Sequence, residues 1–217
     1  MILNLIHESL FPLLRSSLLT INLTVISMAI GACLALPLAL GRLSTNRWLA
    51  GFCFSYIYYF RGTPLLVQIF LIYYGLPQIG LTLSAYISAL LSLTLNTAAY
   101  TAEIIRGGIL AVPAGEIESA YAMGMTRWQV LRRIILPQMI GFALPAYGNE
   151  IILQIKATSL ASTITLMDLT GMARTLAAET YAPLEIFSIA GIIYLVIVFS
   201  TSRLVTGLER RWTLYRC

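Results

Sequence analysis

Long uncharged apolar runs are the feature that most limits what this chain of 217 residues can fold into. No charged side chain occurs from Ser16 to Gly41, and none occurs from Gly62 to Ala102. Each run exceeds the roughly 20 apolar residues that an α-helix needs to cross the hydrocarbon core of a bilayer. With 59% hydrophobic and 11% charged residues, the whole chain also lies outside the usual composition of a soluble domain. We therefore predict an all-α transmembrane protein.

Five spanning helices account for the apolar runs. Gly75, Pro77 and Gly80 favour a break in the second run and divide it into two helices. The first run is too long for a cleaved signal peptide and lacks the positive flank of one, so we expect it to remain as a span. Within one domain of residues 1–217, the predicted spans are about 16–41, 58–76, 81–106, 137–165 and 184–202.

The distribution of positive charge orients the chain, because Lys and Arg concentrate in cytoplasmic loops. The gap after the fourth span holds Arg174 beside three acidic residues. Ten of the fourteen Lys and Arg residues instead fall in the gaps that five spans place on the other side, namely Arg42, Arg47, Arg106, Arg127, Arg132, Arg133, Arg203, Arg210, Arg211 and Arg216. This predicts an outside N-terminus and a cytoplasmic C-terminus. Trp48, Trp128 and Trp212 then fall near the inner interface, where aromatic rings are favoured.

No motif for catalysis, metal binding or phosphate binding occurs in the sequence. The only lysine is Lys156, so the chain has no G-x-x-x-x-G-K-[ST] loop with which to hydrolyse ATP itself. Cys33, Cys53 and Cys217 are too scattered for a disulfide framework or a metal site, and His7 has no partner histidine. The basic residues form no continuous patch for nucleic acid. We expect no catalytic residue, no metal and no cofactor in this chain.

The loop over about 113–136 is the longest predicted cytoplasmic segment. Pro113 favours a helix start and Gly124 a break, so we predict a short helix from Ala114 to Met123. Thr126 is suited to cap a second, amphipathic helix that reaches Ile135. Two short helices joined at a glycine form a knob that suits a groove on another protein. A helix lying on the inner leaflet is the alternative.

The residues of this loop resemble the signature of ABC importer permeases, in which Glu-Ala-Ala is followed after three residues by Gly and after nine more by Ile-x-Leu-Pro. The matching positions here are Glu118, Ser119, Ala120, Gly124, Ile134, Leu136 and Pro137. Ser119 stands in place of the middle alanine and keeps a small side chain there. The resemblance implies that the loop is the coupling helix, which docks in a cleft of a cytoplasmic ATPase, and that Glu118 and Gly124 are its most characteristic positions.

Further stretches are similar to the polar amino acid subgroup of these permeases. They are RGTPLLVQ (61–68), NTAAYTAEIIRGGI (96–109), ILPQ (135–138) and KATSLAS (156–162). Within the subgroup, three segments look most like membrane subunits for histidine, lysine, arginine and ornithine, or for opines built from basic amino acids. These are ALPAYGNE (143–150), ETYAP (179–183) and ERRW (209–212).

The resemblance also implies the assembly. A type I ABC importer permease would be a multi-pass protein of the bacterial cytoplasmic membrane and would pair with itself or with a similar permease chain. It would dock two ATPase subunits, which bind ATP and Mg, and would receive an amino acid from a periplasmic or lipid-anchored binding protein. Whether the pair is a homodimer or a heterodimer, and which basic amino acid or opine is carried, stay open.

Polar groups within the predicted spans are the candidates for a substrate path, because such groups usually face a bundle interior or an aqueous cavity. In the fourth span, helical angle groups Glu150 with Gln154 and Asn149 with Lys156. Our hypothesis is that a substrate path includes Glu150, Asn149 and Gln154, together with Asn96 and Thr97 of the third span. Polar contacts between helices or subunits are the alternative role.

A different class of function would be a secondary ion-coupled transporter with Glu150 as its proton or ion site. Such folds usually show paired internal repeats, and none is present in this sequence. Near the inner end of the third span, Glu103 and Arg106 are three residues apart, a spacing that predicts an intrahelical ion pair.

Overall fold

The structure is a computed structural model that describes residues 2–213, with side chains described for residues 7–212. The elements of this part of the chain are all helical, and four of them are short π or 3₁₀ turns. In order they are α1 (Ile2–Arg42), α2 (Arg47–Gly62), α3 (Leu65–Phe70), η1 (Leu71–Gly75), η2 (Leu76–Ile79), α4 (Ala85–Leu110), α5 (Ala114–Ala122), α6 (Arg127–Val130), η3 (Leu131–Ile135), α7 (Leu136–Ala157), η4 (Thr158–Ile164), α8 (Leu169–Thr180) and α9 (Pro183–Thr213).

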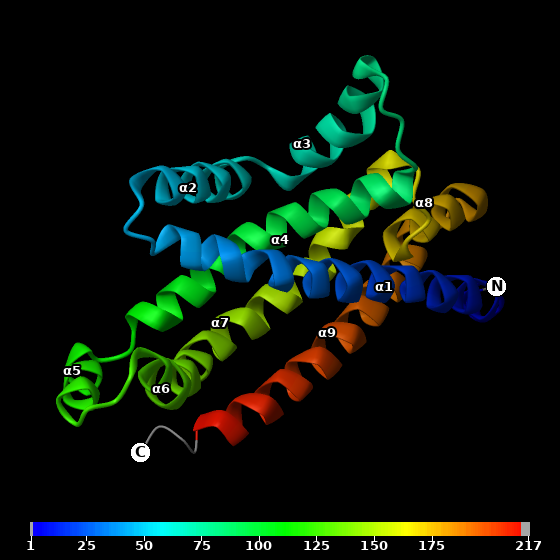
Figure 1. Cartoon of the computed structure of the whole chain (residues 1–217). Helices are drawn as coiled ribbons and strands as arrows, with labels where there is room; N and C mark the ends of the chain where they lie inside the picture. Colours follow the sequence, from blue (N-terminus) through cyan, green and yellow to red (C-terminus); the bar gives the residue numbers. More distant parts are fainter. Residues whose placement is uncertain (1, 214–217) are drawn as a thin grey trace.

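Helix α4 is the centre of the bundle and lies between α1 and α7 (Figure 1). Its contact face is built from small side chains, since Ala98, Ala99 and Ala102 are fully buried. Ala35 and Ala39 of α1 face this part of α4 in the same buried cluster. Small residues let helix backbones approach closely, which is the main way in which helices associate inside a membrane.

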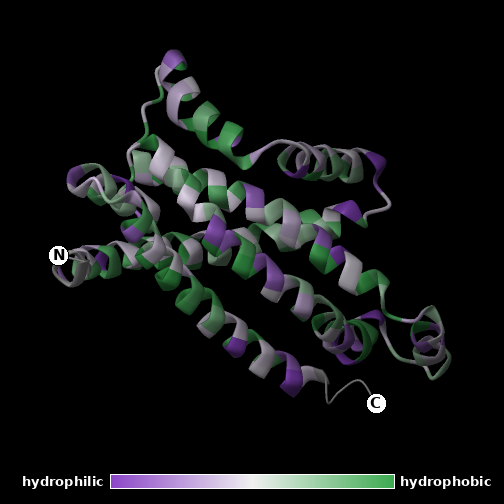
Figure 2. Cartoon of the chain, turned by 180° about the vertical axis from the view of Figure 1, so that it is seen from behind, coloured by the Kyte–Doolittle hydropathy of each residue, from purple (hydrophilic) through white to green (hydrophobic). Residues whose placement is uncertain are grey.

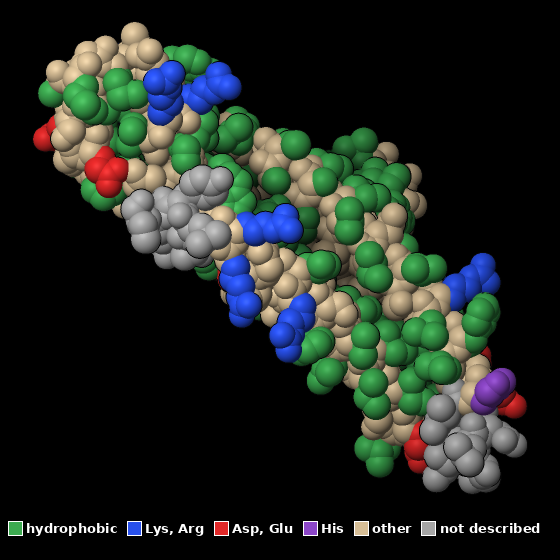
Figure 3. Space-filling view, turned by 90° about the horizontal axis from the view of Figure 1, so that it is seen from below, with side chains coloured by type: hydrophobic (Ala, Val, Ile, Leu, Met, Phe, Trp, Pro, Cys, Tyr) green, Lys and Arg blue, Asp and Glu red, His purple; other side chains and the backbone are tan. Residues whose placement is uncertain are grey.

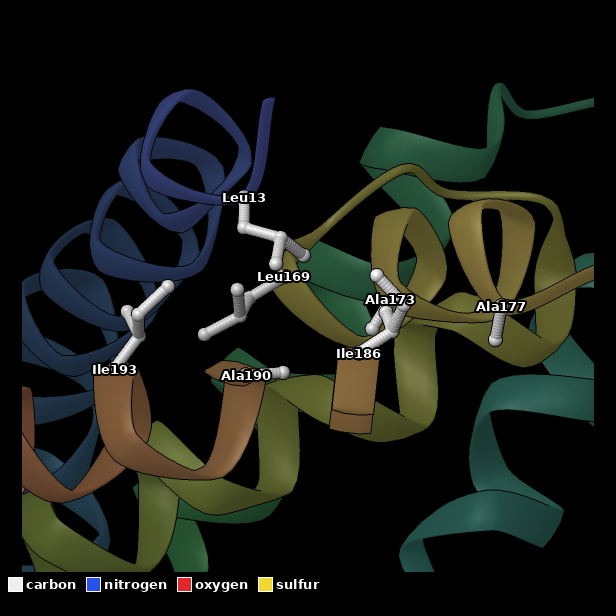
Figure 4. Packing of buried hydrophobic residues seen from close by; sticks show 7 residues of the cluster. All are labelled: Leu13, Leu169, Ala173, Ala177, Ile186, Ala190 and Ile193. Atoms are coloured by element: carbon white, nitrogen blue, oxygen red, sulfur yellow. The ribbon is translucent and has the colours of Figure 1, made fainter. Parts of the chain in front are cut away.

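A second cluster fastens α1 to the last two helices. Figure 4 shows its residues converging from α1, α8 and α9, and the described members are Leu13, Leu169, Ala173, Ala177, Ile186, Ala190 and Ile193. Helix α8 is held at its start by the Asp168 carboxylate, which accepts a hydrogen bond of 2.9 Å from the amide of Gly171. The predicted spans leave α8 out, although Asp168 before an apolar periodic stretch is a recognisable helix start.

The outer helices α1 and α9 contain the longest uninterrupted apolar stretches. Among the described residues, two helices combine the length and hydropathy of a membrane span, over His7–Arg42 and Pro183–Trp212. Figure 2 shows hydrophobic residues along the long helices, with hydrophilic residues at the helix ends and also within the central helices. Those inner hydrophilic residues lower the hydropathy of α4 and α7, which are covered by other helices.

The prediction of one continuous helix over 58–76 is wrong. Helix α2 ends at Gly62, Thr63 is extended with φ −111° and ψ 145°, and α3 begins after Pro64. Proline disfavours the α-helical conformation in the residue before it, so Thr63 leaves the helix. The segment therefore forms two helices that point in different directions (Figure 1).

Other helix ends differ from the predicted spans as well. Helix α1 begins at Ile2 instead of residue 16 and, at 41 residues, is about 60 Å long. Helix α7 ends at Ala157, where the predicted span 137–165 continues as the 3₁₀ turn η4. Helix α9 extends past residue 202 to Thr213. The helices thus include charged residues that a hydropathy scan excludes, because each helix extends beyond its apolar stretch.

Gly31 offers a test of the close contact between α1 and α4. A methyl group at Gly31 would lie 2.4 Å from the Cγ2 atom of Thr97, whereas one at Gly51 of α2 would meet nothing within 4 Å. We expect Gly31→Ala to destabilise the purified chain by about 1–3 kcal/mol through overpacking. Gly51→Ala, the control, is expected to leave stability unchanged or to raise it by about 0.5–1 kcal/mol. Thermal unfolding in detergent measures both, and equal midpoints would refute the close packing.

Candidate functional site

Residues 114–135, from α5 to η3, form a knob at the end of the molecule where the described chain also ends (Figure 1). The predicted helix start and break are confirmed, since α5 covers Ala114–Ala122 after Pro113 and Gly124 has φ +80°. The amide of Met125 donates to the carbonyl of Ala120 at 3.1 Å across this turn. Only glycine adopts such a left-handed conformation without steric cost, so Gly124 sets the angle between the two halves of the knob.

The second half of the knob is also capped as predicted. The Thr126 hydroxyl accepts from the amide of Gln129 at 3.3 Å, and the Gln129 side chain accepts from the amide of Thr126 at 2.8 Å. This reciprocal capping box starts α6, which continues through η3 into α7. The Gln138 side chain at the start of α7 donates to the Glu116 carboxylate of α5. Both halves of the knob are therefore connected to α7.

The three signature residues on α5 divide between its two faces. Glu118 and Ser119 are exposed, and Ala120 is fully buried against the rest of the knob. Tyr121 and Met123 add exposed apolar surface beside Glu118. Seen from below, Lys and Arg side chains gather at the knob end of the molecule and along the last part of α9 (Figure 3).

A buried polar network joins α1, α4 and α7. The Thr97 hydroxyl of α4 lies 3.2 Å from the Glu150 carboxylate of α7 and 3.2 Å from the sulfur of Met28 in α1. Thr97 is fully buried, and Glu150 is only 7% exposed. One helical turn further along α7, Gln154 donates to the Ser27 hydroxyl of α1 at 2.9 Å and to the Leu93 carbonyl at 3.2 Å.

A second set of hydrogen-bonded polar residues, on another side of α4, stabilises the break between α2 and α3. The Asn96 amide donates to the carbonyl of Phe60 at 3.0 Å and to the side-chain oxygen of Gln68 at 3.1 Å. The Gln68 amide in turn donates to the Phe60 carbonyl and to both oxygens of Thr63, at 2.9–3.1 Å. The carbonyls freed where α2 ends thus find donors inside the protein, as lipid surroundings require. Gln68 was not singled out from the sequence, because an isolated glutamine in an apolar run gives no signal of its role.

The predicted substrate-path residues do not form one surface. Glu150, Gln154, Thr97 and Asn96 are buried in contacts between helices. Asn149 and Lys156 are exposed and lie on the adjacent side of α7. The two predicted polar stripes of α7 thus differ in burial, and in this conformation the Glu150 stripe makes contacts between helices, the role given above as the alternative.

The predicted ion pair of Glu103 and Arg106 is present. The Arg106 guanidinium donates to both carboxylate oxygens of Glu103 at 2.8–3.0 Å, and Arg61 approaches the same carboxylate at 3.9 Å. Arg61 also lies over the Tyr100 ring, 5.2 Å from its centroid. Within residues 7–212, no group of three His, Cys, Asp or Glu side chains could hold a metal ion.

Comparison with known proteins extends over nearly the whole chain. The family described as binding-protein-dependent transport system inner membrane component matches residues 27–214. The chain is 52% identical over 217 residues to the octopine transport system permease protein of Rhizobium meliloti, covering 96% of this chain and 88% of that protein. It is 40% identical over 225 residues to the histidine/lysine/arginine/ornithine transport system permease protein of Escherichia coli strain K12, covering 96% and 94%.

Solved structures agree in fold. The crystal structure of an amino acid ABC transporter with histidines matches with a TM-score of 0.90 at 38% identity, covering 95% of this chain and 96% of that one. An inward-facing structure of the MetNI methionine ABC transporter matches with a TM-score of 0.79 at 19% identity, covering 94% and 97%, and shows the fold alone.

Asn96 tests whether the buried polar contacts stabilise the bundle. Asn96→Leu leaves the Gln68 side-chain oxygen without its donor, so we expect a loss of about 1–3 kcal/mol in unfolding free energy. Asn149→Leu makes the same chemical change on the exposed face and is expected to have little effect on the chain in detergent. Thermal unfolding of the two variants decides the point, and equal loss in both would contradict a specific role of the Asn96 contacts.

Proposed function

The chain belongs to the binding-protein-dependent transport system inner membrane components, and on that premise we propose that its importer carries a basic amino acid or an opine. The resemblance to ABC importer permeases is thereby confirmed, and the protein is an all-helical type I permease subunit. It is not an enzyme, since the ATPase of such systems is a separate subunit. A secondary ion-coupled transporter is not supported.

The observation that carries the coupling role is the exposed knob bearing the signature residues. Glu118 and Ser119 are accessible, and Gly124 holds the turn that only glycine adopts freely. We assign Glu118, Ser119, Ala120 and Gly124 to docking on the ATPase, with Ala120 as the buried support of α5. The two ATPase subunits supply ATP and Mg, and their motion reaches α7 through the capping box and the contact of Glu116 with Gln138.

The membrane orientation follows from this assignment. The knob, the end of α9 and the loop between α1 and α2 share one end of the molecule, and the start of α1 lies at the other (Figure 1). We place the knob end in the cytoplasm of a bacterial cell and the N-terminus outside, with five spans. The outer end then receives the amino acid from a periplasmic or lipid-anchored binding protein.

The exposed face of α7 suits the second permease subunit and the substrate path. Asn149 and Lys156 are exposed on a helix whose other sides are covered by α4, α9 and α1. Polar and charged side chains on a spanning helix usually face another protein chain or an aqueous path. We place the second permease, the same chain or a similar one, against this face of α7.

The substrate class rests on the relatives, which are named for octopine and for histidine, lysine, arginine and ornithine. These compounds share a cationic side chain or are built from amino acids that have one. Glu150 is the acidic group that meets the cation when α4 and α7 separate, and its bond to Thr97 occupies it until then.

The first test addresses Gly124. Gly124→Val forces a β-branched residue to φ +80°, at a cost of at least about 1–2 kcal/mol, so we expect substrate-stimulated ATP hydrolysis of the reconstituted complex to fall severalfold. Gly115→Val changes the same knob at a position with open space and no positive φ, and serves as the control. Normal stimulation in the Gly124 variant would reject the coupling role.

The second test addresses Glu150. With arginine, octopine and neutral glutamine titrated against the complex and its binding protein, we expect the native chain to respond to arginine or octopine and not to glutamine. Glu150→Gln keeps an acceptor for Thr97 and removes the charge, so basal hydrolysis should persist while the response to cationic substrate is lost. If the variant responds as the native chain does, Glu150 is only a helix-to-helix contact.

A further inference from the structure

The knob contains a pocket with the chemistry of an anion site. It has a volume of about 500 Å³ and is lined by Trp128, Gln129, Arg132 and Arg133. All four side chains are exposed, and Trp128 is 65% exposed. The signature residues Glu118, Ser119 and Ala120 lie on α5, outside the lining of this pocket, whereas Ile134 of the signature directly follows the pocket in η3.

The two arginines of the pocket are not neutralised within the described part of the chain. The ion pairs recorded for residues 7–212 join Glu103 to Arg61 and Arg106, and neither Arg132 nor Arg133 takes part in one. The Gln129 side chain is engaged in the capping box, and Glu116, an acidic residue of the facing helix α5, accepts from Gln138. Two arginines therefore line a pocket in which the described residues provide no ion-pair partner.

The pocket lies at the level of the membrane boundary. The three tryptophans occur at the start of α2, in α6 and at the end of α9, which share one end of the molecule (Figure 1). Tryptophan favours the headgroup level of a bilayer. The chain turns apolar directly after the pocket, at Ile134 and Ile135, and continues into α7. On the orientation proposed above, these features place the pocket arginines at the height of lipid phosphates.

The local backbone adds a second observation. Arg132 and Arg133 lie in the π turn η3, and π turns within helices occur frequently at functional sites. Here the turn places two successive arginines beside Trp128, at the junction between the polar knob and the apolar helix.

We propose that this pocket binds the headgroup of an anionic phospholipid of the inner leaflet. Arg132 and Arg133 hold the phosphate, since guanidinium groups bind phosphate oxygens through paired N–H donors, and Trp128 packs at the level of the ester groups. The lipid anchors the second half of the knob to the membrane while α5 remains available to the ATPase. This role does not depend on which substrate is carried.

The test uses fluorescence of the full chain in proteoliposomes, with Trp48→Phe and Trp212→Phe so that Trp128 is the only tryptophan. Brominated phosphatidylglycerol and brominated phosphatidylcholine are each titrated as quenchers into phosphatidylcholine. We expect phosphatidylglycerol to quench Trp128 at a mole fraction about 25-fold lower, because each of the two arginines contributes a gain of about fivefold near an anionic lipid.

Replacing both pocket arginines, Arg132→Gln with Arg133→Gln, should abolish this preference and leave quenching by phosphatidylcholine unchanged. Arg127→Gln removes an exposed arginine of the same knob that does not line the pocket, and should preserve the preference. Inorganic phosphate at millimolar concentration should not displace the brominated lipid, which separates a headgroup site from one for free phosphate.

Three outcomes would overturn the proposal. Equal quenching by the two lipids would make Trp128 an unselective interface residue. Absence of quenching by either lipid would place the knob away from the bilayer, as expected if this surface docks on a protein. If Arg127→Gln removes the preference for phosphatidylglycerol as fully as the pocket variant does, the preference reflects only the overall positive charge of the knob. The proposal rests on the proposed orientation of the knob end, but none of these measurements involves transport, so the proposed transport function stands or falls separately.

Discussion

The buried contact of Thr97 with Glu150 shows what holds this bundle together. Lipid chains are as apolar as leucine, so hydrophobic burial does not drive helices together inside a membrane. The chain instead relies on close packing and on polar groups that find partners only in one another. Gly31 brings α1 so near to α4 that a methyl group there would overlap Thr97, and Thr97 in turn reaches Glu150 of α7. Small residues and a shared hydrogen-bond network thus fix three helices at one point.

This arrangement explains why polar residues interrupt the apolar stretches of the central helices. Helices α1 and α9 pass a simple test for membrane spans, whereas α4 and α7 carry the buried polar groups. An unpaired Glu150 in hydrocarbon would be costly, so its helix must be covered by others. The same property lets the α4–α7 contact rearrange, because its polar groups can exchange partners when the helices move. A purely apolar contact would offer a substrate nothing to bind.

The helix start, turn and cap of the knob could be predicted from the sequence because the signals for them are local. A glycine at the turn, a threonine cap and a proline start are read within a few residues, and all three are present where predicted. The prediction of one helix over 58–76 was wrong although the signal was again local. The long apolar run was given more weight than the effect of Pro64 on the backbone conformation of Thr63. The partners of Asn96 and Gln154 could not be predicted, because they lie on other helices and are 28 and 127 residues away in the chain.

The two faces of α7 connect the separate parts of the molecule. Its start joins the knob through Gln138, its buried face holds Glu150 and Gln154 against α4 and α1, and its outer face presents Asn149 and Lys156. A displacement of the knob acts on α7 near its first turn, and the helix is continuous from there to Glu150. The contacts that would respond are the polar ones, since hydrogen bonds depend on direction and distance more strongly than apolar packing does. Movement imposed at the knob end can thereby change which groups Glu150 contacts about 20 Å further along the helix.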